Sequence, residues 1–193
     1  MNQHIPQEPE LEPMTRMQVL AAMGVTALVL LLISRFWLFF DTVTLMPSQL
    51  NPLHLGSGAA LGLGITVASA AVYQIWPGYR RSADFYLKFV LSPLQWSDLI
   101  WMGLLPGLSE ELLFRGVMLP AIGLNWFGVG ISGLCFGVLH LSGLQQWPYV
   151  VWATLVGVAL GTSVLLTGNL MVPIMAHITA NLISSLFWKW RSA

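Results

Sequence analysis

The sequence predicts an all-α protein, a polytopic bundle of about six transmembrane helices with a further helical segment at the membrane surface. Charged residues make up only 8% of the chain and hydrophobic residues 56%, and the mean hydropathy is +0.73. A soluble domain has about 25% charged residues. The apolar residues also form several runs of about 20, the length of helix that crosses a bilayer. With 193 residues, the chain has room for one bundle rather than several domains.

The N-terminal part of the chain is expected to hold a tail and two spans. Residues 1–16 are polar and contain three prolines, which is typical of a disordered tail. The apolar run at 17–40 follows an acidic segment and is too long for the apolar part of a signal peptide, so we expect it to remain as a span. The second span is expected at 53–76, where Gly58 and Gly62 would let another helix approach closely.

The segment 77–93 mixes basic and aromatic residues and is amphipathic, so we place it at the membrane interface rather than across the membrane. Four more spans are expected at 96–124, 126–144, 149–166 and 170–188. The first of them is expected to break near Pro106 and Gly107, because proline removes a backbone hydrogen bond. We therefore divide the chain into a tail (1–16), an N-terminal part with two spans and the surface segment (17–94), and a core (95–193).

The basic residues predict the orientation of the bundle. Six of the eight Lys and Arg residues fall on one side of a six-span arrangement: Arg16, Arg80, Arg81, Lys88, Lys189 and Arg191. The other two, Arg35 and Arg115, lie within spans. By the positive-inside rule both termini face the cytoplasm, or the stroma of an organelle. We expect a cell inner membrane or a thylakoid or other organellar membrane. The net charge of zero argues against a nucleic-acid-binding surface.

Three charged residues inside the third span are the main functional clue. A charged side chain at the centre of a membrane helix costs about 2.5–3.5 kcal/mol on insertion scales, so such residues need partners and usually have a function. Glu111 and Arg115 are four residues apart and lie on one helix face, where they can form an ion pair. Glu110 points about 100° away and is left for another partner.

Two later spans carry polar pairs at the same helical spacing, Phe136 with His140 and His177 with Asn181. The three spans could bring these residues to one intramembrane pocket around Glu110. In a pocket of low dielectric, a carboxylate can act as a general base on water. A histidine can share the proton or orient the water. A second histidine and an asparagine can donate hydrogen bonds to a developing oxyanion.

In this order along the chain, the three motifs resemble those of the CPBP family of intramembrane proteases, which includes the type II CAAX prenyl proteases and the Abi bacteriocin-immunity proteins. The motifs are Glu110-Glu111-x-x-x-Arg115, Phe136-x-x-x-His140 and His177-x-x-x-Asn181. Each motif alone is weakly specific, but the three in order are specific. The resemblance covers about residues 95–190.

By that resemblance, the protein is an integral membrane endopeptidase. Glu110 and His140 would activate the attacking water, and His177 and Asn181 would form the oxyanion hole. Glu111, Arg115 and Phe136 would support the site. The implied partners are membrane lipid and a membrane-associated or lipid-modified peptide substrate.

A metal cofactor is the main mechanistic alternative. Two glutamates and two histidines could bind zinc. However, the histidines come from separate spans rather than from one HExxH helix, and Arg115 would repel a dication. We therefore expect no cofactor, with zinc as the less favoured alternative.

Two other functions fit the same composition. A non-proteolytic membrane scaffold or assembly factor of the same fold could retain the pocket. A proton-coupled transporter could use Glu110 as a relay, but the halves of the chain show no inverted repeat.

Overall fold

The computed structural model describes residues 14–192, which are helical with no strand among them. The α-helices are α1 (Arg16–Phe40), α2 (Pro52–Ile75), α3 (Pro77–Leu91), α4 (Leu99–Glu111), α5 (Leu119–Ile122), α6 (Trp126–Leu139), α7 (Trp147–Thr167) and α8 (Met171–Ser192). Shorter helical turns are η1 (Trp96–Asp98) and η3 (Leu144–Gln146), and η2 (Leu112–Met118) is a π-helix. Most of the tail predicted at 1–16 lies outside the described residues, and α1 already begins at Arg16, capped by Thr15.

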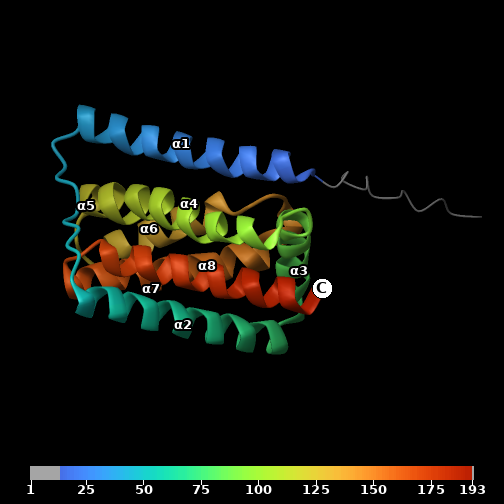
Figure 1. Ribbon diagram of the computed structural model, residues 1–193. Coiled ribbons are helices and arrows are strands. Elements are labelled where there is room, and N and C mark those ends of the chain that lie inside the picture. The colour runs from blue at the N-terminus through green and yellow to red at the C-terminus, as the bar shows by residue number, and fades with distance from the viewer. Residues whose placement is uncertain (1–13, 193) are drawn as a thin grey trace, which may run out of the picture.

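Within residues 14–192, four helical segments are long and apolar enough to cross a membrane. They are Arg16–Phe40, Pro52–Ile75, Leu144–Thr167 and Met171–Ser192. In addition, α4, η2 and α5 follow one another without interruption and form one helix (Figure 1). The protein is thus a helical integral membrane bundle, as the composition predicts.

Helix α6 is shorter than the span expected at 126–144. It has 14 residues, which at about 1.5 Å per residue gives about 21 Å, against about 30 Å of hydrocarbon. The helix ends because the backbone of His140 leaves the helical conformation, with φ of −90° and ψ of 8°. His140 therefore sits at a helix end rather than within a regular span.

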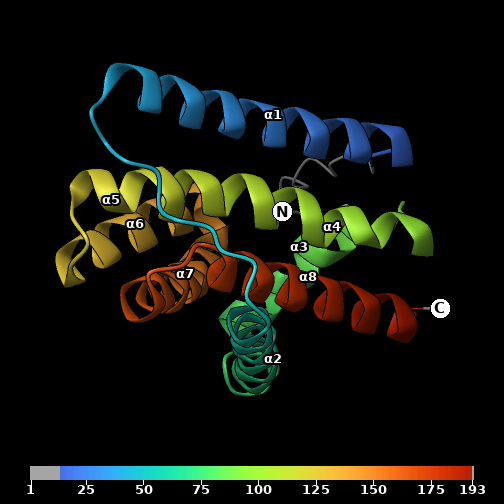
Figure 2. The same ribbon diagram turned by 60° about the vertical axis from the view of Figure 1, so that its left-hand side comes forward.

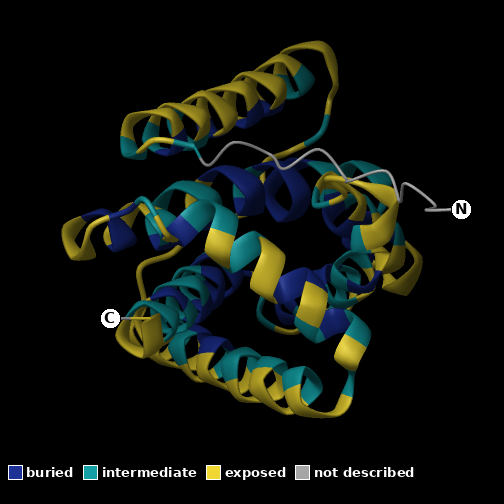
Figure 3. Cartoon of the chain, turned by 90° about the vertical axis from the view of Figure 1, so that its right-hand side faces the viewer, coloured by how far each residue is buried: buried dark blue, intermediate teal, exposed yellow. Residues whose placement is uncertain are grey.

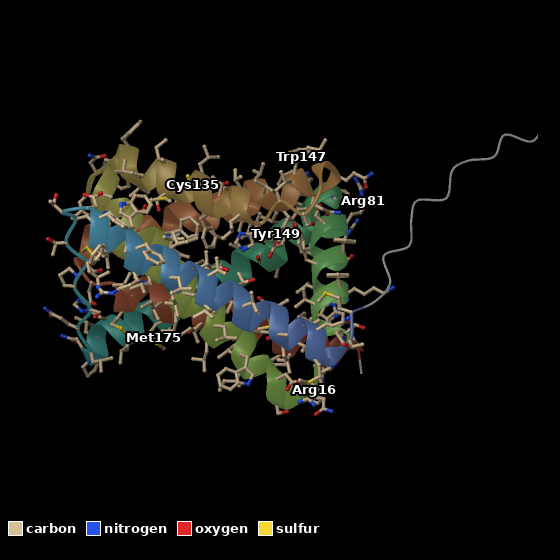
Figure 4. The ribbon with its side chains drawn as sticks, turned by 90° about the horizontal axis from the view of Figure 1, so that it is seen from above. Arg16, Arg81, Cys135, Trp147, Tyr149 and Met175 are labelled. Atoms are coloured by element: carbon tan, nitrogen blue, oxygen red, sulfur yellow. The ribbon has the colours of Figure 1, made fainter. Side chains whose placement is uncertain are left out.

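The helices form a layered bundle with most of its basic residues at one end. Helices α1 and α2 lie on opposite sides of α4 and α8 (Figure 2). Helix α3 stands across the end of the bundle where α1 begins and α8 ends (Figure 1), as expected for a surface helix. The turns at the other end, at 41–51, 123–125 and 168–170, contain no Lys or Arg. Figure 4 shows Arg16 and Arg81 at the α3 end.

Close helix contact explains the predicted glycine step on α2. A Cβ atom at Gly58 would lie 2.6 Å from the carbonyl oxygen of Val172, and one at Gly62 would lie 2.4 Å from that of Ala176. Only glycine therefore lets α2 approach α8 at this distance. The outer faces of α1 and α2 carry exposed residues (Figure 3), among them Phe40 and Val67, which are 82% and 70% exposed. These apolar faces suit contact with lipid.

The break expected near Pro106 and Gly107 is not found, because α4 continues through both residues. The carbonyl of Met102, which loses its usual partner at Pro106, accepts a hydrogen bond from the Asn181 side chain instead. The irregular stretch comes later, after the glutamate pair. There η2 widens to a π-helix, in which the N–H of Leu119 donates to the carbonyl of Phe114, five residues back.

Candidate active site

The centre of the site is a buried ion pair. Glu111 and Arg115 are both fully buried, and Arg115 Nη1 donates to Glu111 Oε1 at 2.9 Å. The second guanidinium nitrogen, Nη2, donates to the carbonyl of Gly157 on α7 at 2.8 Å. The pair predicted from the four-residue spacing is therefore present, and it joins the α4–η2 helix to α7.

His177 reaches the same carboxylate from α8. Its Nδ1 lies 2.8 Å from Glu111 Oε1. An ionised carboxylate only accepts hydrogen bonds, so Nδ1 carries a proton and Nε2 is left to face another group. His177 was expected beside Glu110, but its hydrogen bond goes to Glu111. The two donors, Arg115 and His177, thus converge on one oxygen of one glutamate.

Glu110 and His140 face each other across a gap. His140 Nε2 lies 3.9 Å from Glu110 Oε2. The other ring nitrogen, Nδ1, donates to the carbonyl of Phe136 at 2.8 Å, and since a carbonyl only accepts, this fixes the tautomer of the neutral ring with a lone pair on Nε2. Among the described residues, Glu110 Oε2 is buried and has no hydrogen-bond partner. Two acceptors placed in this way can share one donor, such as a water molecule that gives a hydrogen to each.

The Phe136 ring contacts both histidines of the site, His140 and His177. Its ring centroid lies 4.9 Å from that of His140 and 5.8 Å from that of His177. The guanidinium carbon of Arg115 lies 4.4 Å from the Phe136 centroid, which places the cation over the ring. This side chain, predicted to support the site, thus touches both histidines and the buried arginine.

Asn181 lies one turn beyond His177 on α8, where its Nδ2 donates to the carbonyl of Met102 at 3.2 Å. The structure therefore places His140 beside Glu110 and His177 beside Glu111. Asn181 instead contacts an earlier turn of α4.

A cavity of about 240 Å³ opens beside Glu110. Its walls come from α1, from the end of α3 and from α4, and they are mostly apolar, including Val19, Met23, Phe89 and Leu105. Of the four residues predicted to be catalytic, Glu110 lines it. The carboxylate is therefore at the edge of an apolar space formed largely by α1.

Two tyrosines at the site were not predicted. The Tyr86 hydroxyl of α3 donates to the His140 carbonyl and accepts from the backbone N–H of Ser142 at 3.1 Å. The Tyr149 ring of α7 lies 4.5 Å from the Tyr86 ring and 6.0 Å from that of His140. The only sequence signal was the aromatic content of the surface segment, which does not reveal a partner more than 50 residues away.

The site does not fit a zinc ion. Within residues 14–192, no three His, Cys, Asp or Glu side chains are grouped as a metal site would require. A catalytic zinc ion takes three protein ligands, whereas here one oxygen of Glu111 already accepts hydrogen bonds from Arg115 and His177.

Comparison with known proteins bears on the same region. Residues 92–183 match the family model described as type II CAAX prenyl endopeptidase Rce1-like. The chain is also 32% identical over 120 residues to the uncharacterized protein YpbD of Bacillus subtilis (strain 168). The aligned region covers 62% of this chain and 61% of that relative. The chain thus spans about three fifths of the curated relative that it matches. No solved structure matches it. All three motifs lie inside the matched region, so the likeness to this family rests on the same residues that form the candidate site.

Proposed function

We propose that the protein is an integral membrane endopeptidase that hydrolyses a peptide bond in a membrane-associated substrate, with Glu110 as the general base. The observation that carries the proposal is the buried, unpartnered Oε2 of Glu110 opposite His140 Nε2 at 3.9 Å. A general base must reach its proton directly or through one water, and this gap suits a water that bridges the two acceptors. The Rce1-like family match supports peptidase chemistry.

The proposed reaction needs only groups of this chain and one water. The water oxygen attacks the scissile carbonyl carbon as its proton passes to Glu110, while His140 orients the water through Nε2. Glu110 then returns that proton to the leaving amine as the carbon–nitrogen bond breaks. A doubly protonated His177, balanced by Glu111, would donate from Nε2 to the oxyanion.

The cavity suggests how the substrate is held. Its apolar walls, formed largely by α1, would accept an apolar segment or a lipid modification of the substrate next to Glu110. The core at 95–193 would then carry the chemistry, and α1 and α3 would complete the binding space. We also propose that the basic end of the bundle, with both termini, faces the cytoplasm or stroma.

The test is cleavage by purified protein in vesicles. The probe is a quenched fluorescent peptide with a farnesylated cysteine, compared with the same peptide without the lipid. Glu110→Gln keeps the size and shape of the side chain but removes the base, so turnover should fall by about 10² to 10⁴-fold while the melting temperature stays close to wild type. Ser163→Ala is the control, because its buried hydroxyl donates to the carbonyl of Leu160 within α7 and lies outside the cavity walls.

Retention of cleavage by Glu110→Gln would overturn the proposal. A second experiment separates the enzyme from a scaffold or assembly factor. If cells that lack the protein are rescued equally well by wild type and by Glu110→Gln, the pocket is not used for hydrolysis in that role, and the scaffold function replaces the peptidase.

A further inference from the structure

Helix α4 has a defect one turn before the glutamate pair. In an α-helix the N–H of residue 106 would donate to the carbonyl of Met102, but Pro106 has no N–H. Pro106 also lines the cavity beside Glu110. An unpaired carbonyl is costly within a membrane, since no water is there to satisfy it. The defect is therefore a weak point close to the proposed base.

Asn181 fills this defect from α8. Its Nδ2 donates to the Met102 carbonyl at 3.2 Å, and so replaces the donor that Pro106 lacks. The two helices are in close contact on both sides of this bond. A Cβ atom at Gly103 would lie 2.6 Å from the Leu182 side chain, and one at Gly107 would lie 2.5 Å from that of Ile178. The bond therefore lies within a tightly packed seam between α4 and α8.

We propose that Asn181 is a positioning residue that acts through α4. By closing the gap at Pro106, it fixes the turn that carries Glu110 and Glu111 relative to α8. The effect of Asn181 on turnover rests on the peptidase function proposed above. Its effect on α4 does not depend on that function.

A double-mutant cycle tests this role. Asn181→Leu keeps a side chain of similar size but removes the donor, and should lower both the melting temperature and kcat, with KM little changed. Pro106→Ala supplies the missing N–H to the Met102 carbonyl. In the Pro106→Ala background, Asn181→Leu should therefore lower the melting temperature and kcat much less. Ser192→Ala, at the end of α8, serves as the control.

Two results would overturn the proposal. One is an equal fold-loss of kcat from Asn181→Leu in both backgrounds with an unchanged melting temperature, which would show that Asn181 contacts the reacting groups. The other comes from hydrogen–deuterium exchange, which needs neither turnover nor the Pro106 variant. Backbone amides of residues 103–111 should exchange faster in Asn181→Leu than in wild type, and unchanged exchange would refute the role. Absence of peptidase activity in wild type would contradict the proposed function and leave the exchange and melting results to decide this inference.

Discussion

At the scale of single residues, two adjacent glutamates have different partners. One oxygen of Glu111 accepts hydrogen bonds from Arg115 and His177. Its Oε2, like Oε2 of Glu110, is buried without a hydrogen-bond partner among the described residues, and Oε2 of Glu110 faces His140 Nε2 at 3.9 Å. The sequence predicted this difference, because successive helical residues point about 100° apart. It did not predict that His177 would bind Glu111, since that contact depends on how α8 packs against α4.

Loss of one member of the buried pair should destabilise the protein. Glu111→Gln and Arg115→Leu each leave a charge buried without its partner, at a cost of about 3–5 kcal/mol. Both variants should give less folded protein in size-exclusion chromatography than Glu110→Gln. The double variant should recover part of the loss. Wild-type yields from both single variants would show that the pair does not support the fold.

Tyr86 should matter for the geometry of His140. Tyr86→Phe keeps the ring beside Tyr149 but removes the hydroxyl that binds the His140 carbonyl and the Ser142 N–H. The expected stability loss is about 1 kcal/mol, as for one neutral hydrogen bond, together with a fall in kcat. Tyr73→Phe is the control, because its hydroxyl donates to exposed Asp84. A fall in kcat of the same size in both variants would argue against a specific effect on His140.

At the scale of whole elements, glycine determines how closely α2 packs on α8. Gly62→Ala should lower the melting temperature, because its Cβ would lie 2.4 Å from a backbone oxygen and overpacking of this kind costs about 1–3 kcal/mol. Gly64→Ala, in the same helix, meets nothing within 4 Å and should be neutral or stabilising. Equal effects of the two changes would show that the contact is loose.

The start of α1 is held by a charge pair that should depend on pH. Arg16 donates two hydrogen bonds of 2.7 Å to Asp98, which precedes α4. The hydrogen bond from Arg16 is the main reason that the pKa of Asp98 falls to about 2, from an ordinary value of 3.8. A carboxyl group whose pKa is lower in the folded state stabilises the protein above its unfolded pKa and loses this effect as the pH falls through its folded pKa.

The pair should therefore contribute fully above about pH 4 and lose its effect as the pH falls toward about 2. The measurement is the difference in Tm between wild type and Asp98→Asn over this range. That difference should shrink toward zero at the acid end. A difference that does not change with pH would mean that the pair does not hold α1.

For the whole molecule, the sequence predicted the features that depend on local pattern. Apolar runs predicted the membrane helices, and the mixture of basic and aromatic residues predicted the surface segment. The four-residue spacings predicted which polar side chains share a helix face. Individual contacts between distant elements could not be predicted. Tyr86 binds a backbone carbonyl 54 residues away, and in α4 the Met102 carbonyl, one turn before Pro106, accepts a hydrogen bond from a side chain on α8. The π-helix likewise has no signal in the residue pattern of 112–118.

The arrangement of the ends predicts a topology experiment. In a Cys135→Ser background, new cysteines at Thr15 and Ser192 should react with a membrane-impermeant reagent from the same side. A cysteine at Ser48, in the turn between α1 and α2, should react from the other side. The basic end should be cytoplasmic or stromal. Labelling of residues 15 and 192 from opposite sides would contradict the bundle described here.

The π-helix at Leu112–Met118 has a consequence for comparison among relatives. A π turn accommodates one more residue than an α turn, so it is equivalent to a single-residue insertion in a helix. The wider turn takes up the extra residue, so deletion of one apolar residue there would restore a regular α-helix and leave Glu111 and Leu119 in register. The same deletion in the regular part of α4 would instead rotate the two parts of the helix by about 100° relative to each other. Relatives that share this site should therefore tolerate a one-residue gap within 112–118 and not within α4.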